Sequence, residues 1–494
     1  MAEPTLGRRL AEFAAGATYD TLPEAVTDSV RKRVLDVIGL CVAAHRLPTS
    51  AAIVGYVRDQ GGAPQAHVVG GGAPVPAALA ALANGVLAHS LDYDDTHLPS
   101  VLHPSAPVIP AALAAAELAG ASGRDTIRAI AVGLEVCVRL GMAGYDPEAG
   151  NSTFFEHGQH ATSICGTMGG AVAAALLFGL PAEGVLDSLG LAASTASGII
   201  EGNRTGGTVK RLHCGWAAHA AVTSADLVRR GFTGPPTVIE GRFGFFEAFL
   251  HGHYEAGEIT RGLGSEWAVP GIFFKPYPAN HFTHAAIDAA MGLRAQGLDP
   301  HRVERLTLGV PAPVIRTIGQ PIEAKRTPET GYQAQFSGPY AVAAGLLGGG
   351  GLGLGLADFT DELARDPLRR ELMAKVDVVP DERATEIFPH QFPAVLRARD
   401  ADGREWRQEV LANRGGPDRP LSAEELALKF RDNAAGRLSA ATADAVAELA
   451  GRLEEAGEVG ELLRLVAVFE PEPSALSPEP SALSPQPGAR SPEP

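Results

Sequence analysis

Cysteine, aromatic residues and positive charge are all scarce in this chain. It has 4 cysteines and 6% aromatic residues among 494 residues, and its formal net charge is −16. The cysteines show no CxxC spacing and lie in apolar segments, which is typical of reduced thiols and excludes a disulfide framework. The acidic balance leaves no broad basic face, so neither nucleic acid nor an anionic membrane is an expected partner.

Long hydrophobic runs are missing too. No stretch of eighteen consecutive apolar residues occurs, which argues against a membrane-spanning helix. The N-terminal segment lacks the apolar core of a secretory signal. With 45% hydrophobic and 20% charged residues the composition is that of a globular protein. We therefore expect a cytoplasmic location and no membrane partner.

The length of the chain favours two domains. Alanine-rich helical periodicity runs from Leu22 to about Leu263, and short β-prone segments follow Trp267. The predicted fold class is mainly α, with a large all-helical domain and a smaller α+β lid domain. The predicted boundaries are 1–267 for the first part of the helical domain, 268–412 for the lid domain, 413–469 for a helical segment that returns to the large domain, and 470–494 for a disordered Pro/Ser-rich tail.

Individual elements follow from the same periodicities. The predicted helices are Ala25–Ala44, Ala111–Leu118, Ile127–Leu140, Gly166–Phe178, Val185–Ala196, Ala217–Arg230 and Ala285–Arg294. The predicted strands are Phe273–Phe274, Val303–Val310, Ala374–Val379, Val395–Arg399 and Trp406–Leu411. The glycine run Gly348–Gly355 has neither a Walker pattern nor a GxGxxG pattern, and we interpret it as a linker.

Titratable residues are concentrated ahead of one alanine-rich helix. The segment Asn84–Pro107 contains three aspartates, three histidines and a threonine, and 11 of the 15 histidines lie between His89 and His284. Such a density of proton-transfer groups is of little use in a core and of much use in acid–base catalysis.

The motifs in this segment resemble a known family. Leu91–Thr96 (Leu-Asp-Tyr-Asp-Asp-Thr) followed by His103–Pro107 (His-Pro-Ser-Ala-Pro) is similar to the signature of the MmgE/PrpD family, which includes 2-methylcitrate dehydratases and cis-aconitate decarboxylases. Further similar motifs follow in family order at Gly158–Gly166, Thr208–Ala217, Gly231–Gly241, Lys275–Pro278, Thr283–Asp288 and Phe336–Tyr340. The resemblance spans nearly the whole chain. It implies a homodimeric enzyme that needs no cofactor and no metal.

The same resemblance implies a set of site residues. The implied catalytic residues are His103, His160, Asp92, Thr96, Lys210, Lys275 and Tyr340, and the implied substrate-binding residues are Lys210, Lys275, His281 and Thr96. The residue types suit these roles independently. His103 and His160 each precede a predicted helix and stand beside Ser or Thr, where free backbone amides are expected. A polycarboxylate in so acidic a chain needs fixed cations, which Lys210 and Lys275 supply.

The family resemblance implies a lyase that acts on a small polycarboxylic acid, and these residues suit that chemistry. Dehydration of the 2-methylcitrate type or decarboxylation of the cis-aconitate type builds negative charge beside a carboxylate, and Lys210 and Lys275 neutralise that charge. The two histidines serve as acid and base, without an assignment of which is which. Asp92 orients one imidazole, and Thr96 or Tyr340 holds the substrate.

Several alternatives stay open. An epimerase or isomerase of a related di- or tricarboxylate needs the same groups, and a non-catalytic carboxylate-binding protein that recruits partners through its Pro-rich tail needs fewer. Clustered aspartates also suit Mg²⁺ binding or helix capping. Because the family resemblance argues against a metal, we interpret Asp94 and Asp95 as structural.

Ala279–Phe282 stands where many family members carry an arginine-containing run. Protonated His281 is the candidate to replace that arginine in part, and a dicarboxylate substrate is the alternative to a tricarboxylate. The spacing from Thr96 to His103 is one residue longer than in the decarboxylases, which shifts the expected position of His103.

Overall fold

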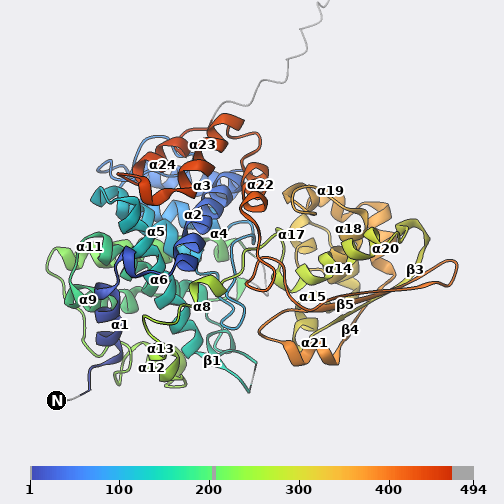
Figure 1. The fold of residues 1–494 in the computed structure, drawn as a ribbon, viewed down its shortest axis with the longest axis horizontal. Helices are drawn as coiled ribbons and strands as arrows, with labels where there is room; N and C mark the ends of the chain where they lie inside the picture. Colours follow the sequence, from blue (N-terminus) through green and yellow to red (C-terminus); the bar gives the residue numbers. More distant parts are fainter. Residues whose placement is uncertain (1–2, 149, 203–206, 470–494) are drawn as a thin grey trace, which may run out of the picture.

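A computed structural model describes residues 3–148, 150–202 and 207–469 of the protein. The fold is mainly α, with a large helical body beside a smaller body that carries a β-sheet (Figure 1). The predicted fold class is therefore confirmed. The predicted tail, 470–494, lies outside the described residues.

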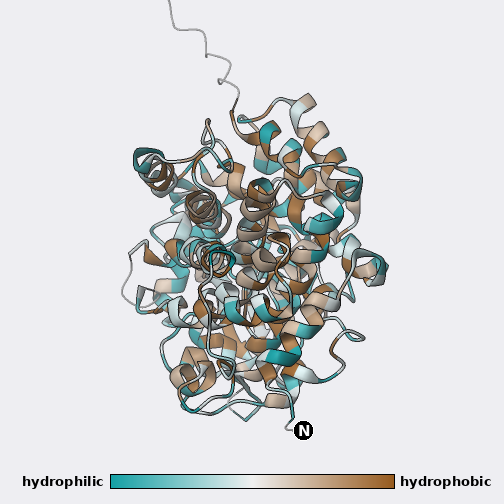
Figure 2. Ribbon diagram, turned by 90° about the vertical axis from the view of Figure 1, so that its left-hand side faces the viewer, coloured by the Kyte–Doolittle hydropathy of each residue, from teal (hydrophilic) through white to brown (hydrophobic). Residues whose placement is uncertain are grey.

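The large body is built almost entirely from helices. They are α1 (Leu6–Gly16), α2 (Glu24–Ala44), α3 (Pro48–Gln60), α4 (Ala77–His89), α5 (Ser105–Ala119), α6 (Gly123–Ala143), α7 (Thr153–Glu156), α8 (Ala161–Leu177), α9 (Ala182–Thr195), α11 (Val209–Arg229), α12 (Phe245–Leu250) and α13 (Ala256–Thr260), with the two-residue strands β1 (Tyr145–Asp146) and β2 (Asn151–Ser152). Apolar and polar segments alternate around most of these helices (Figure 2), as expected where one face is buried.

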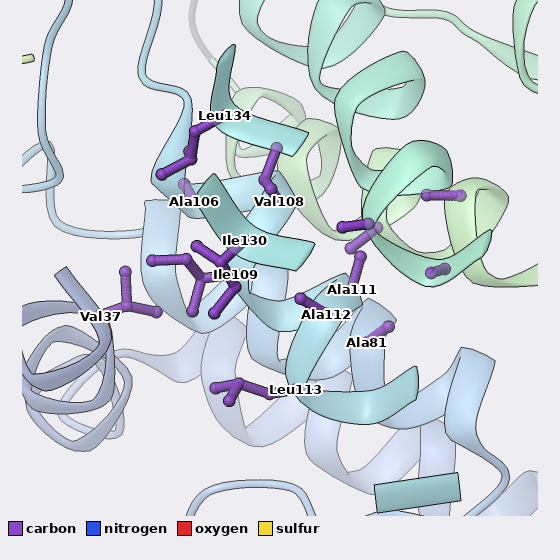
Figure 3. Close-up of a cluster of buried hydrophobic side chains, with 14 of the residues drawn as sticks. Val37, Ala81, Ala106, Val108, Ile109, Ala111, Ala112, Leu113, Ile130 and Leu134 are labelled. Carbon is purple, nitrogen blue, oxygen red and sulfur yellow. The ribbon is translucent and has the colours of Figure 1, made fainter. Parts of the chain in front are cut away.

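Small residues let the central helices of this body approach each other closely. A Cβ atom added at Gly85 on α4 would lie 2.7 Å from Cα of Gly215 on α11, and one added at Gly133 on α6 would lie 2.7 Å from the carbonyl oxygen of Gly169 on α8. Alanine and branched aliphatic side chains fill the remaining space (Figure 3). The contact at Gly85 sets the C-terminal end of α4 against the N-terminal half of α11, where the site lies.

The smaller body is an α+β unit. Its elements are α14 (His284–Ala295), β3 (Val303–Val310), α15 (Ile315–Ile318), α16 (Ile322–Arg326), α17 (Gly331–Ala334), α18 (Gly338–Leu347), α19 (Asp361–Ala364), α20 (Pro367–Ala374), β4 (Val376–Pro380), α21 (Glu382–Ile387), β5 (Ala394–Asp400) and β6 (Glu405–Val410). The strand order is β4-β3-β5-β6, with β3 parallel to β4 and the other pairs antiparallel. Helix α14 packs on β5 and β6 and against α18.

The chain then returns to the large body through α22 (Ala423–Ala434), α23 (Ala440–Gly451) and α24 (Gly460–Val466), which lie at the top in Figure 1. A fully buried ion pair joins Lys429 on α22 to Asp36 on α2 at 2.7 Å. The larger hydrophobic cluster accordingly draws residues from Leu10–Ile272 and again from Phe430–Val466. The smaller cluster draws its residues from Tyr277–Val410.

Most of the predicted elements are present with shifted ends, and two predictions are wrong. Phe273–Phe274 is not a strand, because Phe273 forms only an isolated antiparallel bridge with Thr96. Helix α11 begins at Val209, eight residues before the predicted start, so Lys210 lies inside its first turn. The glycine run after α18 is a loop, in which Asp358 accepts hydrogen bonds from the amides of Gly350 and Gly355.

No single helix in the described ranges is long and apolar enough to cross a membrane. One bent pair, α2 with α3, passes that test by length and composition alone.

The close approach of α4 and α11 makes Gly85 sensitive to substitution. In Gly85→Ala the new Cβ would lie 2.7 Å from Cα of Gly215 and 2.8 Å from the carbonyl oxygen of Cys214. We expect a loss of about 1–3 kcal/mol in the free energy of unfolding, because backbone atoms must move apart. The measurement is denaturant unfolding. The matched control is Gly55→Ala on α3, which meets no atom within 4 Å and should stabilise by about 0.5–1 kcal/mol. Equal effects of the two substitutions would contradict the close approach.

Candidate active site

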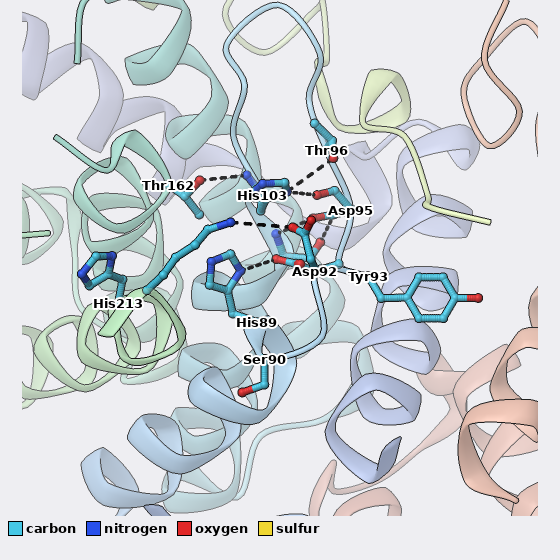
Figure 4. Close-up of polar contacts among 12 residues, drawn as sticks. His89, Ser90, Asp92, Tyr93, Asp95, Thr96, His103, Thr162 and His213 are labelled. Carbon is cyan, nitrogen blue, oxygen red and sulfur yellow. Dashed lines mark hydrogen bonds and ion pairs between the residues drawn. The ribbon is translucent and has the colours of Figure 1, made fainter. Parts of the chain in front are cut away.

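Three buried aspartates stand within the six residues Leu91–Thr96, which we call the carboxylate turn. The exposed fractions of Asp92, Asp94 and Asp95 are 6%, 0% and 2%. Buried carboxylates persist only where cations or hydrogen-bond donors meet them. Each of the three has a cationic or imidazole partner, and Figure 4 shows Asp92 and Asp95 beside His89 and His103.

Asp92 brings two lysines together. Nζ of Lys275, which precedes the smaller body, lies 2.8 Å from the backbone carbonyl oxygen of Asp92 and 3.3 Å from its Oδ1, and Nζ of Lys210 lies 3.7 Å from the same Oδ1. The left-handed backbone of Asp92, with φ 53°, turns both oxygens to the same side. Burial raises the pKa of Asp92, but the two lysines outweigh burial and lower it to about 2. Asp92 in turn raises the pKa of Lys210 against the effect of burial.

Asp94 and Asp95 contact side chains from helices of the large body. Oδ2 of Asp94 lies 2.6 Å from Nδ1 of His89 at the end of α4. Asp95 forms an ion pair at 2.7 Å with Arg33 of α2. The Asp95 carboxylate also accepts hydrogen bonds from the backbone amide and the hydroxyl of Ser105, the first residue of α5. Asp95 thus caps α5, in agreement with the structural role expected from the sequence.

The surroundings of His103 fix its tautomer. Its Nδ1 lies 2.6 Å from the backbone carbonyl oxygen of Asp95, which can only accept, so Nδ1 carries the proton of the neutral ring and Nε2 carries the lone pair. Burial lowers the pKa of His103 to about 4, although Asp94 acts in the opposite direction. Thr162 accepts a hydrogen bond from the backbone amide of His103 at 3.1 Å, and Thr96 Oγ1 lies 3.4 Å from its Nδ1.

Four imidazole rings lie in one cluster with these groups. The ring centroid of His89 is 5.6 Å from that of His103 and 5.5 Å from that of His160, which is 5.0 Å from that of His213. His160 is the N-cap of α8, and His213 lies on α11 three residues after Lys210, on the same face. Among the described residues, none bonds to Nε2 of His103 or of His160, and neither atom is sealed in the interior. Both nitrogens can therefore meet a ligand.

The structure brings together six of the residues expected from the sequence, namely Asp92, Thr96, His103, His160, Lys210 and Lys275. It does not bring Tyr340 to them. Tyr340 is fully buried in the smaller hydrophobic cluster, where its hydroxyl donates to the backbone carbonyl of Asp358. The expectation that Asp92 orients an imidazole is also wrong, because Asp92 meets lysines and the carboxylate that binds an imidazole is Asp94.

His281 lies beside the cluster, and its pKa responds to Lys275 and His103. Its ring is 4% exposed and packs among His284, Phe273 and Phe392, and neither ring nitrogen has a hydrogen-bond partner. Burial lowers its pKa well below the usual value. His281 is therefore neutral and does not supply the positive charge expected of an arginine substitute.

Sequence reasoning missed three residues of this region. His89 and His213 stand in apolar or helical segments and carry no distinguishing signal apart from the i, i+3 spacing of His213 from Lys210. The third is Tyr332 on α17, a half-exposed residue of the smaller body whose phenol raises the pKa of Lys210. Within the described ranges, no group of three or more His, Cys, Asp and Glu side chains is arranged to hold a metal ion.

Comparisons with known proteins agree with this arrangement. The MmgE/PrpD N-terminal domain matches residues 8–256, and the MmgE/PrpD C-terminal domain matches residues 277–455. The cis-aconitate decarboxylases of Mus musculus and Homo sapiens are 28% and 29% identical to the chain over 79% of its length, and the matches cover 79% and 80% of their own lengths. A cis-aconitate decarboxylase-like protein, oryM of Aspergillus oryzae, is 26% identical over 90% of the chain and 94% of its own length.

Fold, site and relatives define an enzyme of the lyase class. The chain belongs to the MmgE/PrpD family, whose two domain types together match most of its residues.

The buried histidines make stability depend on pH. Burial lowers the pKa of His97 from 6.5 to about 4. Between these values the unfolded chain binds more protons than the folded one, so the free energy of unfolding falls as the pH drops through this window. In His97→Gln we expect that fall to be smaller by up to about 3 kcal/mol. The measurement is thermal unfolding between these two pH values. His253→Gln, at an exposed position, is the control, and a wild-type pH dependence in His97→Gln would contradict the assignment.

Proposed function

We propose that this lyase decarboxylates a small unsaturated polycarboxylate of the cis-aconitate type, and that it does so without a metal or redox cofactor. The observation that carries the proposal is the convergence of Lys210 and Lys275 on one carboxylate oxygen of Asp92. Two ammonium groups that share one position form a receptor for carboxylate. The relatives named cis-aconitate decarboxylase supply the substrate class.

The charge that develops in this reaction suits the two lysines. Loss of CO₂ moves an electron pair through the neighbouring double bond onto a carbon beside a remaining carboxylate, into which the charge delocalises. Lys275 is 1% exposed. Fixed ammonium groups in such a dry environment stabilise the developing charge far more than they would in water.

One proton must then reach that carbon. In this scheme His160, whose Nε2 is bonded by none of the described residues, is the acid, while Thr96 and Tyr332 bind the substrate by hydrogen bonds. Tyr332 thereby takes the role that we had expected of Tyr340, since its phenol interacts with Lys210. His89 stays bound to Asp94 and spaces the rings of His103 and His160.

The lone pair on Nε2 of His103 favours a second candidate, dehydration of the 2-methylcitrate type. That reaction needs a base for a C–H proton and an acid for the departing hydroxyl. The backbone carbonyl of Asp95 holds His103 in the basic tautomer, which suits the first of these tasks. Epimerisation uses the same base and returns a proton to the opposite face. The homodimeric state and the cytoplasmic location stay predictions.

Product analysis separates these reactions. Chelator-treated protein in D₂O is incubated with cis-aconitate, 2-methylcitrate, citrate and several dicarboxylates and is followed by proton NMR. We expect CO₂ release from cis-aconitate, with one solvent deuterium in the product. Olefinic products without CO₂ would establish a dehydratase, and exchange of substrate protons alone would establish an epimerase. Binding without any chemical change would leave only the non-catalytic alternative.

Lys275→Met tests the electrostatic role. Because this substitution removes one of two cations from the developing charge, we expect kcat to fall by about 10²–10³-fold. The control is Lys375→Met, which removes a partly exposed lysine that forms an ion pair with Glu371 outside the site. Steady-state kinetics checks both variants. Turnover of Lys275→Met as fast as that of the control would exclude Lys275 from charge stabilisation.

A further inference from the structure

His160 and His213 share a hydrogen bond that the proposed chemistry has not yet used. Their Nδ1 atoms are 3.1 Å apart, and the rings are inclined by 47°. His160 caps α8 and His213 lies one turn into α11, so the bond joins two helices. The Ser163 hydroxyl donates to the backbone carbonyl of His213 at 3.1 Å, which holds the first turns of the two helices together.

A bond between two Nδ1 atoms holds one proton, so the tautomers of the two rings are linked. If Nδ1 of His213 donates, Nδ1 of His160 carries a lone pair and its Nε2 carries a proton that faces the site. If His160 donates instead, its Nε2 presents a lone pair. A lone pair repels an anionic substrate, whereas an N–H group binds it. A bound polycarboxylate therefore selects the arrangement in which His213 donates.

The two rings also differ in their access to water. His160 is 2% exposed and His213 is 6% exposed. Within the described part of the chain, no residue bonds to Nε2 of His213, and that atom is not sealed in the interior. Burial lowers the pKa of His160 well below the usual value and that of His213 to about 4, so both rings are neutral near pH 7. The pair therefore leads from solvent-accessible space to the site through neutral imidazoles.

We propose that His213 is a relay residue that passes a solvent proton to His160 and thereby sets His160 as the acid of the reaction. A hydronium ion or buffer acid protonates Nε2 of His213, the Nδ1 proton of His213 moves to Nδ1 of His160, and the Nε2 proton of His160 moves to the substrate carbanion. One proton enters and one leaves, and both rings stay neutral and exchange tautomers. After product release, water in the site protonates Nε2 of His160, its Nδ1 proton returns to Nδ1 of His213, and Nε2 of His213 loses its proton to water, which restores the starting tautomers. The inference rests on the proposed function.

Decarboxylation requires a proton from solvent, which such a relay would deliver. Each turnover replaces a carboxylate by hydrogen and consumes one proton from solvent, whereas dehydration and epimerisation return the proton that they remove. His103 is not an equivalent source, because its Nδ1 proton is bound to the carbonyl of Asp95. His160, the proposed acid, is nearly buried. It needs a path for reprotonation that stays open while substrate fills the site, and His213 supplies that path.

The tautomers can be measured without turnover. Solid-state ¹⁵N NMR of histidine-labelled protein, with His160 assigned from the spectrum of His160→Gln, reports which nitrogen carries the proton. With citrate bound, a polyanion that has no double bond and so cannot undergo the proposed decarboxylation, we expect His160 to be protonated at Nε2 and unprotonated at Nδ1. In His213→Ala we expect that preference to be lost. A His160 ring protonated at Nδ1 in the citrate complex would overturn the proposal, whether or not the enzyme decarboxylates cis-aconitate.

Kinetics separates relay from support of the fold. His213→Asn keeps a group that can donate to Nδ1 of His160 but cannot pass a proton on, and His213→Ala removes both functions. We expect kcat for cis-aconitate to fall by about 10²-fold in both variants with little change in KM. Added imidazole should restore turnover in His213→Ala in a saturable manner. The matched control is His219→Asn on the same helix, where His219 bonds only to the carbonyl of Ala78 and stacks on Trp216.

Wild-type kcat in His213→Asn would show that His213 only positions His160, and it would overturn the relay. Loss of activity in His213→Ala without rescue by imidazole would overturn it as well. If the wild-type enzyme releases no CO₂ from any substrate, the proposed function fails, and the NMR result alone then decides the direction of the hydrogen bond.

Discussion

The neutralisation of three buried carboxylates in one short turn is the constraint on which the rest of the structure depends. Lys275 and Lys210 meet Asp92, His89 meets Asp94, and Arg33 meets Asp95. Removing one member of such a buried pair leaves an uncompensated charge and costs about 3–5 kcal/mol. Helices α2, α4 and α11 and the segment that enters the smaller body must therefore converge on the turn. The network that neutralises the three carboxylates is the same network that forms the site.

Burial of this network also sets its chemistry. The dry surroundings lower the pKa values of His103 and His160, which keeps both rings neutral near pH 7. They also strengthen the field of the lysines. A chain with a net charge of −16 can thus offer an anion a local position with two cations. The close helix contact at Gly85 and Gly215 keeps α4 and α11 near enough for His89, Lys210 and His213 to share that position.

Local patterns predicted much of the fold. Strand β3 was predicted with its observed bounds and α14 within one residue at each end, because alternation and helical periodicity are properties of neighbouring residues. The start of α11 was missed because its first turn carries Lys210 and His213, polar groups that face the site and interrupt the apolar pattern of a helix. Tyr340 was assigned to the site from a motif, but its ring packs in the smaller cluster, while Tyr332 of the same region is the tyrosine that influences the pKa of Lys210.

The sequence by itself determined the family, the mainly α fold class and six of the residues that meet in the cluster, since residue types and their order are enough for a resemblance. Only the tertiary structure decided the roles. Asp92, Asp94 and Asp95 are near neighbours in sequence, yet they have different partners. Asp92, whose backbone is left-handed, contacts the two lysines, whereas Asp94 contacts His89 and Asp95 contacts Arg33. Whether an imidazole is a base or part of a relay depends on which atom meets its Nδ1. That atom comes from a residue distant in sequence, as in the pair His160 and His213, or from the turn of a loop, as in the carbonyl of Asp95 that binds His103.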